Sequence, residues 1–484
     1  MAKFLRSDTW LFQKRYVIGY LLIVATFVAL LFFAGAIVPG GISEGEKQSV
    51  VTAANLDLQD PASLAVPSLP YYVLQRGVIE LFGVSTFSIK LPSLILAFFA
   101  GIGAVFLLRR WFKPNIALLA AVIMITTGQF LYVAQSGTPN IMFILWSVWL
   151  LLTATLITTS PRYARLWKVL FFVIVPLSLY TPLSVYLVLA IVSAGLIHPH
   201  VRYVIRRMPK KHLVMFMTLS LLVVLPLLYL AVQKPALVPQ LLGLPSDWPP
   251  NVISNAGTLL QQYVNFIAPQ SGTVMTPVFG LGSIALIVLG LWRLGKISYT
   301  ARSYTMVAWA VMTLPILIIN PTNTTIIFVP LLILMASGLE FLLRSWYGIF
   351  PRNPYARFVG LIPLVILVGG LVASGVNRYF YGYSHDPLTA SHFSQDLNLL
   401  EKQIAGNAST TLIVTKAEKD FYLAVDTLGR DADDKLVVTT NTNAAPNGQL
   451  MATKAAHAAM NRSIERIVTS PASENADRFY VYKK

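Results

Sequence analysis

Two glutamates near the start of the chain, Glu44 and Glu46, are its best candidates for acid–base chemistry. Ser43 precedes Glu46 by three residues, which is the spacing of a capping box at a helix N-terminus. Glu44 would stand at the first helical position and is not needed for that box. Because the N-terminal end of a helix favours an ionised carboxylate, Glu44 suits a general base better than a general acid. Helix capping is the simpler explanation for Glu46, and stabilisation of the first turn is the alternative for Glu44.

The amino-acid composition limits the other chemistry that the chain can do. It contains no cysteine, which excludes a disulfide, a thiolate nucleophile and a cysteine-based zinc or iron–sulfur site. The C-terminal part shows neither a glycine-rich phosphate loop nor a metal-ligand spacing, and we predict no metal site and no certain cofactor. Catalysis would depend on carboxylates, amides, hydroxyls and six histidines.

The elements that must position these residues are membrane-spanning helices. Hydrophobic residues make up 56% of the 484 residues and charged residues only 12%, whereas about a quarter of the residues of soluble proteins are charged. Long apolar stretches recur, and the alternation typical of an outer-membrane barrel is absent. We predict a polytopic all-α membrane protein with about eleven transmembrane helices, of which the fifth and sixth could form one kinked helix. They lie near residues 16–38, 89–108, 116–133, 141–157, 169–180, 183–197, 213–232, 278–294, 304–319, 325–343 and 358–376.

Lys and Arg are concentrated on the N-terminus and on every second connection between these helices, for example at residues 202–211. Such residues are retained on the cytoplasmic side of a plasma membrane, so we predict a multi-pass protein with a cytoplasmic N-terminus and an extracytoplasmic C-terminus. The basic residues behind the net charge of +17 are dispersed over the N-terminus and five connections. This distribution favours attraction to membrane lipid and argues against nucleic-acid binding.

Two regions on the predicted outer side are long enough to fold. Residues 39–88 show two helical patterns that are too short or too polar to span, so we expect juxtamembrane helices there. Residues 377–484 carry equal numbers of acidic and basic residues and predict a small extracytoplasmic α/β domain beside a transmembrane domain of residues 1–376. Its predicted strands are residues 411–415, 436–440, 464–469 and 479–482, and its predicted helices are residues 391–404, 418–428 and 449–460.

The order of motifs in the membrane part resembles a known family. Residues 69–74 (LPYYVL) and 81–93 (LFGVSTFSIKLPS), the turn at residues 134–140 (AQSGTPN) and the late span at residues 321–338 are similar to motifs of bacterial GT-C-fold membrane glycosyltransferases. These are relatives of dolichyl-phosphate-mannose protein mannosyltransferases and lipid A aminoarabinose transferases, within glycosyltransferase family 39. The resemblance covers about three quarters of the chain.

The resemblance implies an enzyme that moves a sugar from a polyprenyl-phosphate donor to an extracytoplasmic acceptor, which is a protein, a lipid or a cell-wall glycan. A carboxylate of the first outer loop, Glu44 with Glu46, would deprotonate the acceptor hydroxyl. Substrate contacts would come from a second group of residues, namely Tyr71, Tyr72, Arg76, Gln135 and Asn140.

The chain departs from the family at its acidic motifs. Ser43–Glu44 stands where the family usually has Asp-Glu, and Asn140 stands where it has Asp. The amide of Asn140 neither accepts a proton nor holds a divalent ion well. The resemblance nevertheless leaves open that the protein binds a divalent metal ion. The alternative function is a non-catalytic GT-C-fold protein that binds lipid-linked sugar or cell-wall polymer, and the third is an unrelated scaffold or transporter.

Overall fold

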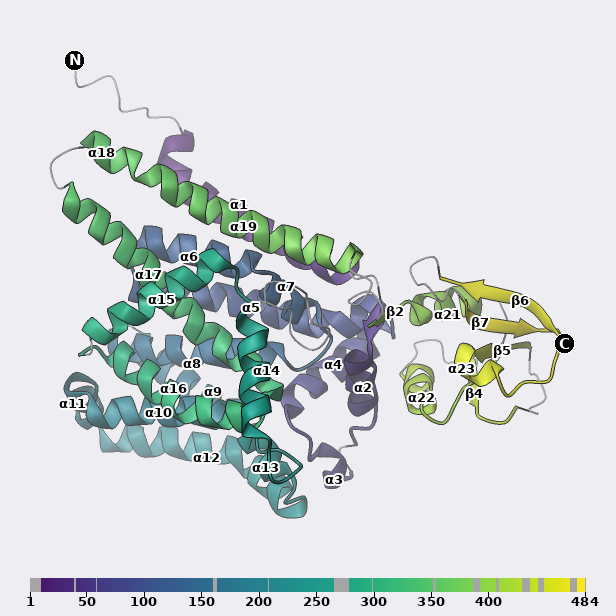
Figure 1. Ribbon diagram of the computed structural model, residues 1–484. Coiled ribbons are helices and arrows are strands. Elements are labelled where there is room, and N and C mark those ends of the chain that lie inside the picture. The colour runs from purple at the N-terminus through teal and green to yellow at the C-terminus, as the bar shows by residue number, and fades with distance from the viewer. Residues whose placement is uncertain are drawn as a thin grey trace.

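The computed structural model is a bundle of long helices with a small sheet domain at one end (Figure 1). It describes residues 10–38, 41–57, 59–159, 163–207, 209–264, 278–297, 299–350, 354–385, 392–405, 409–428, 436–442, 448–470 and 477–483. The C-terminal sheet domain lies beside the short helices of residues 44–82, at the end of the bundle opposite the start of α1 (Trp10–Ala36).

Seven helices of the described residues are long and apolar enough to cross a membrane, and up to nine spans result if each of two bent pairs counts as one. The seven are α1 (Trp10–Ala36), α5 (Thr86–Trp111), α8 (Ile141–Thr159), α12 (Lys210–Gln233), α16 (Ala301–Ile319), α17 (Phe328–Ile349), which continues the 3-10 helix η2 (Pro321–Ile327), and α19 (Leu361–His385). The bent pairs are α6 (Pro114–Thr126) with α7 (Gly128–Gln135), at 56°, and α10 (Ser184–Ile197) with α11 (Pro199–Arg206), at 89°.

Two further apolar helices are shorter than these spans, α9 (Ala164–Ser178) and α15 (Leu281–Lys296). Each of the eleven predicted apolar segments therefore overlaps a helix, and the predicted class of a polytopic helical membrane protein with a small C-terminal sheet domain is confirmed. By length and composition the described residues give seven to nine spans, fewer than the predicted number of about eleven. The fifth and sixth segments are separate helices, because the chain turns at residues 179–183 and Leu183 has a left-handed backbone (φ 62°). Connections on the surface contain α13 (Leu237–Leu242), α14 (Val252–Val264) and α18 (Pro354–Val359).

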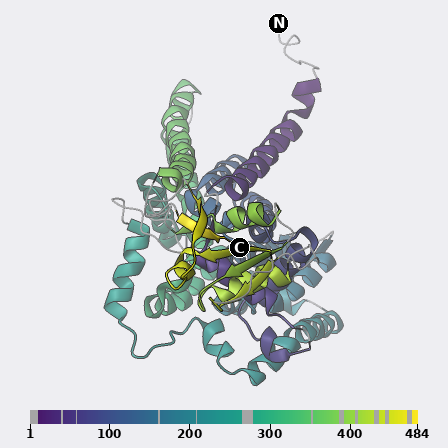
Figure 2. The same ribbon diagram turned by 90° about the vertical axis from the view of Figure 1, so that its right-hand side faces the viewer.

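The centre of the bundle is formed by α5, α8 and α17, each of which buries more than half of its apolar window. By contrast, α1, α12 and α19 bury less than a fifth of theirs. Figure 2 shows α1 and α19 diverging from each other as they extend away from the bundle. Apolar helix faces left open in this way are those expected to meet lipid.

The chain between α1 and α5 contains two helices that are not among the candidate membrane spans. They are α2 (Glu44–Ala54) and α4 (Leu69–Phe82), joined through the short helix α3 (Pro61–Leu64). The amide of Gln75 on α4 is fully buried and fixes their position. It accepts a hydrogen bond from Ser49 on α2 at 2.7 Å and donates to the carbonyl oxygens of Ile89 and Gly137 at 3.3 and 3.1 Å.

The C-terminal region forms a five-stranded sheet in the order β4-β3-β5-β7-β6. Its strands are β3 (Thr410–Ile413), β4 (Leu436–Thr439), β5 (Gln449–Thr453), β6 (Ile464–Thr469) and β7 (Asp477–Tyr482), and its helices are α21 (Asp396–Ala405), α22 (Lys419–Thr427) and α23 (Lys454–His457). The pairs β3–β4 and β3–β5 are parallel, and β5–β7 and β6–β7 are antiparallel. The predicted boundary between the domains at residue 376 stays a prediction.

One predicted element of this region is wrong. Residues 449–460 were expected to form a helix, but residues 449–453 form the central strand β5, and only the four residues of α23 are helical. Residues 450–453 are all buried between β3 and β7. Burial on both faces removes the alternation that reveals a strand in the sequence, so tertiary packing outweighs the local preference.

Candidate functional site

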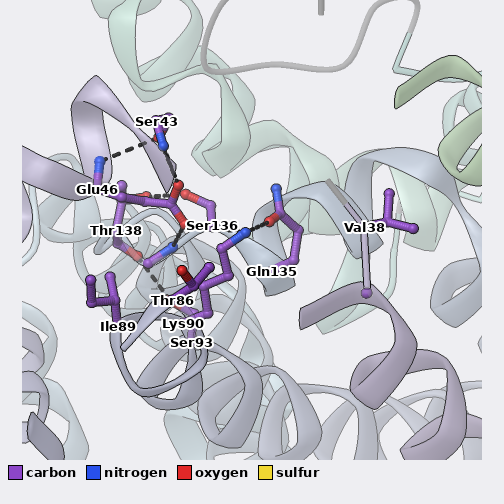
Figure 3. A network of polar contacts seen from close by, with 12 residues as sticks. Val38, Ser43, Glu46, Thr86, Ile89, Lys90, Ser93, Gln135, Ser136 and Thr138 are labelled. Carbon is purple, nitrogen blue, oxygen red and sulfur yellow. Dashed lines mark hydrogen bonds and ion pairs between the residues drawn. The ribbon is translucent and has the colours of Figure 1, made fainter. Parts of the chain in front are cut away.

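Glu46 lies at the centre of a buried polar network between α2, α5 and the turn after α7 (Figure 3). Its side chain is fully buried. The backbone N–H and the hydroxyl of Ser43 donate to Oε2 at 2.7 and 2.9 Å, and Glu46 N–H donates to the Ser43 hydroxyl, which completes the predicted capping box. The backbone N–H of Gly137 donates to Oε1 at 2.9 Å. Both oxygens are thus engaged, so Glu46 fixes α2 against the turn after α7.

The cation of this network is Lys90, which is in the first turns of α5 and is also fully buried. Its Nζ atom lies 3.9 Å from Oε1 of Glu46 and donates to Oε1 of Gln135 at 2.9 Å. Nε2 of Gln135 is buried and has no hydrogen-bond partner among the described residues. A buried ammonium and a buried amide therefore present donor capacity that their protein neighbours do not fully use.

Glu44 occupies a different environment from Glu46. Its side chain is 86% exposed and forms an ion pair with Lys47 at 2.6 Å. Nζ of Lys47 also lies 5.9 Å from the ring centre of Phe421 on α22. Glu44 thus lies on the surface near the C-terminal domain, and the predicted pair of catalytic glutamates is divided between surface and interior.

Tyr71 and Tyr72 face α5 and each other at the start of α4. The hydroxyl of Tyr71 is hydrogen-bonded to that of Ser93 at 2.9 Å, and the two tyrosine rings pack edge to face. Burial raises the pKa of Tyr71 well above its ordinary value and that of Tyr72 to about 12. Both therefore act as neutral hydroxyl groups near pH 7.

Among the described residues, no hydrogen bond or ion pair joins Arg76 or Asn140 to the Glu46 carboxylate. Arg76 forms an ion pair with Glu80 at 2.7 Å and donates to the backbone carbonyl of Leu56, so it joins α4 to the chain after α2. Asn140 is partly exposed at the end of the turn that precedes α8. Of the seven predicted site residues, the structure brings Glu46 and Gln135 together around Lys90.

Lys90 is the residue that was missing from the predicted set. It stands within the quoted LFGVSTFSIKLPS passage, where it is the basic residue that begins an otherwise apolar helix. Ionisable groups at such positions are costly and often functional, which is the signal that could have identified it. Its partner Glu46 could not be identified in this way, because the pairing joins separate elements.

A strand of the C-terminal region covers this network. β1 (Ile42–Ser43) pairs antiparallel with β2 (Phe393–Ser394), and the ring centre of Phe393 lies 5.7 Å from Nζ of Lys90. The side chains of Thr86 and Asn398 are hydrogen-bonded at 2.5 Å. The ring of Phe393 therefore covers Lys90 at the junction between the two parts of the chain.

The described residues do not fit a divalent metal ion at this site. They contain no group of three or more His, Asp or Glu side chains that could hold one. Both oxygens of Glu46 accept N–H or O–H hydrogen bonds, and the ammonium of Lys90 beside them would repel a cation.

Comparison with protein families gives one match. Residues 66–230 match the model of the dolichyl-phosphate-mannose-protein mannosyltransferase family. This segment begins just before α4, ends within α12 and contains Lys90 and Gln135. No curated protein sequence matches the chain.

Comparison with solved structures gives matches over nearly the whole chain. ArnT from Cupriavidus metallidurans in the apo state is 12% identical, with a TM-score of 0.57 over 96% of this chain and 98% of ArnT. The same protein bound to undecaprenyl phosphate gives a TM-score of 0.56 at 12% identity and the same coverage. The Archaeoglobus fulgidus oligosaccharyltransferase tethered to an acceptor peptide gives 0.47 at 12% identity, over 88% of this chain and 64% of that one.

Proposed function

We propose that this chain, which has the GT-C fold of ArnT, is a membrane glycosyltransferase that moves a sugar from a polyprenyl-phosphate donor to an extracytoplasmic acceptor. The fold class and the predicted family resemblance agree with the comparisons. The activity, the donor and the acceptor are parts of the proposal. ArnT has been solved with undecaprenyl phosphate, which supports a polyprenyl-phosphate ligand for a chain of the same fold.

The observation that carries the proposal is the buried pair of donors, Lys90 Nζ and Gln135 Nε2. An ammonium removed from water is stable only beside negative charge or strong acceptors. Glu46 supplies part of that charge from 3.9 Å, and its oxygens are shared with Ser43 and Gly137. A phosphate oxygen would accept from Gln135 Nε2 and from the remaining N–H groups of Lys90, so we assign these two residues to the phosphate of the donor lipid.

In the proposed reaction, the acceptor hydroxyl oxygen bonds to the anomeric carbon of the sugar while the bond from that carbon to the phosphate oxygen breaks. The electron pair of the broken bond leaves with the polyprenyl phosphate, whose charge Lys90 stabilises. The acceptor proton passes to Glu44, which is open to the aqueous side. Glu46 positions Lys90 and does not receive the proton, because its oxygens already accept three hydrogen bonds.

A second candidate function is binding of the lipid-linked sugar without transfer. It is favoured by the exposure of Glu44 and its ion pair with Lys47, which give that carboxylate no fixed orientation toward a substrate. Ser43, where relatives have an acidic residue, uses its hydroxyl in the capping box. In this function Lys90 and Gln135 would keep their role and no bond would change.

We assign the protein to the plasma membrane with its N-terminus in the cytoplasm, on the basis of the distribution of Lys and Arg. Both juxtamembrane helices and the sheet domain would then lie on the extracytoplasmic side. Acceptors reach the site from that side in the proposed reaction.

The test uses the full chain purified in detergent with a panel of polyprenyl-phosphate sugars and hydroxyl acceptors. Release of polyprenyl phosphate reports transfer, and retention of labelled donor reports binding. We expect Lys90→Gln to abolish donor binding. Glu44→Gln should retain binding and lower turnover by about a hundredfold or more, as expected for loss of a general base.

Glu80→Gln is the matched control, because Glu80 is another ion-paired surface glutamate of the same loop. It should leave turnover unchanged. Binding without release for every sugar would favour the second function, and normal turnover of a folded Glu44→Gln protein would remove Glu44 from the mechanism. Absence of donor binding by the wild-type chain would overturn both functions.

A further inference from the structure

A pocket distinct from the Glu46 network opens at the break between α6 and α7. Three elements line it: the break itself with Thr127 and Gln129, the start of α15 with Gly280 and Ser283, and α19 with Arg378. Arg378 is the sole charged residue among those described residues that line the pocket. The charge of the pocket lining therefore suits an anion.

Close packing of α19 holds Arg378 at this position. Gly375 lies one turn before Arg378, and a Cβ atom added to it would be 2.3 Å from the carbonyl oxygen of Thr126. The two backbones therefore touch at the end of α6. Residues three apart share one helix face, so the contact at Gly375 directs Arg378 toward the break.

Ser283 provides a second group that suits an anion. The residue is 5% exposed, and no hydrogen bond joins its hydroxyl to another of the described residues. Because Ser283 lines the pocket, a ligand or water there can complete its hydrogen bonding. Ser283 is in the first turn of α15, and it lines the same pocket as Arg378.

Backbone N–H groups at two helix N-termini add further donors that suit an anion. Both α7 and α15 begin at this pocket, and the N-cap residues Thr127 and Gly280 provide no side-chain cap to either helix. The first N–H groups of a helix have no partner within the helix, and their dipoles favour an anion. Two helix starts, a hydroxyl and a guanidinium thus converge on one space, without an opposing acidic side chain in its described lining.

The position of the pocket along the bundle indicates where the anion comes from. Arg378 lies near the end of the apolar span Leu361–Gly382, most of which faces outward from the bundle. At 1.5 Å per residue this places it roughly 26 Å along α19, near the far edge of a hydrocarbon core of about 30 Å. That edge is on the side of the sheet domain (Figure 1), where the phosphates of one lipid leaflet lie.

We propose that this pocket binds the phosphate of a lipid headgroup, with Arg378 and Ser283 as its side-chain ligands. The lipid enters laterally from the leaflet beside the sheet domain. The inference does not depend on sugar transfer, because Lys90 and Gln135 are not among the lining residues.

The test is native mass spectrometry of the delipidated full chain titrated with phosphatidylglycerol, with diacylglycerol and inorganic phosphate as separate arms. We expect phosphatidylglycerol to bind and diacylglycerol, which lacks the phosphate, not to bind. Arg378→Gln should weaken binding by about ten- to a hundredfold, the range for loss of a charge-assisted hydrogen bond. Ser283→Ala, which keeps every charge, should weaken it several-fold.

Arg110→Gln is the matched control, since Arg110 is an exposed arginine at the opposite end of the bundle. It should bind phosphatidylglycerol as the wild type does. Equal weakening by Arg110→Gln, or wild-type affinity in both pocket variants, would overturn the proposal. If Arg378→Gln fails to fold, Ser283→Ala decides alone. Equal binding of diacylglycerol, or binding of inorganic phosphate as strong as that of the lipid, would also overturn the assignment to a lipid phosphate.

Discussion

At the scale of single residues, Glu46 stabilises the fold while Glu44, two positions earlier, contributes little. Glu46→Gln replaces an acceptor oxygen with an amide that cannot accept from all of its donors, and it leaves Lys90 without a charge partner. We expect the free energy of unfolding in detergent to fall by about 2–4 kcal/mol. Glu44→Gln removes only an exposed ion pair and should change it by less than about 1 kcal/mol. Equal losses in the two variants would contradict this division of roles.

Glu401 on α21 predicts a pH dependence of the C-terminal domain. Burial raises the pKa of its carboxyl group above the ordinary 4.5, and its Oε1 has no partner among the described residues. The folded chain therefore binds this proton more tightly than the unfolded chain, so stability falls as the pH rises above 4.5 through the folded-state pKa. We expect Glu401→Gln to reduce this loss and to slow hydrogen exchange in α21 at pH 7 relative to wild type. Faster hydrogen exchange in α21 of the variant than of the wild type at neutral pH would contradict this prediction.

At the scale of elements, α15 and α17 cross through glycines. A Cβ atom on Gly338 would lie 1.9 Å from the carbonyl oxygen of Leu286, and the Arg293–Glu340 ion pair at 2.7 Å spans the same crossing. Gly338→Ala must separate the helices and strain that buried pair, so we expect a lower unfolding temperature. Gly369→Ala on α19 is the control, because a Cβ there has open space and only improves helix propensity. An unchanged unfolding temperature for Gly338→Ala would refute the close crossing.

The elements that the sequence predicts well are those with strong local signals. The eleven apolar segments, α2 with its Ser43–Glu46 capping box, and α4 are examples, because length, hydropathy and cap spacing are properties of short windows. Which glutamate is buried is not such a property. The cap spacing distinguishes Glu46 from Glu44 but does not say which of them is buried, and that choice depends on Lys90 and Gly137, 44 and 91 residues from Glu46. The central strand β5 was missed for the same reason.

At the scale of the whole molecule, the sheet domain is joined to the membrane part at the candidate site. Ile42 and Ser43 pair with Ser394 and Phe393, and apolar side chains of α2 and α22 share one core. Forming this pairing from the unfolded chain closes a loop of about 350 residues, which costs conformational entropy. Because the paired residues are so far apart, no short window of the sequence predicts the pairing. In the folded chain the pairing places the ring of Phe393 over Lys90, which is fully buried.

Gly41 gives a way to open this junction. A Cβ atom there would lie 2.6 Å from the carbonyl oxygen of Ser394, so Gly41→Val must displace β2 from β1. We expect Lys90 to react with an amine-directed acylating reagent in this variant and to be protected in the wild type, as measured by peptide mass spectrometry. The exposed Lys416 should react equally in both proteins.

Gly45→Ala is the matched control for that experiment, since its Cβ would make only an ordinary contact of 3.6 Å with the side chain of Thr138. It should leave Lys90 protected. Because donor phosphate must reach Lys90 in the proposed function, Gly41→Val should also speed donor binding without changing turnover at saturation. Protection of Lys90 in a folded Gly41→Val protein would show that β2 is not what covers it, and access would then have to come through the membrane helices.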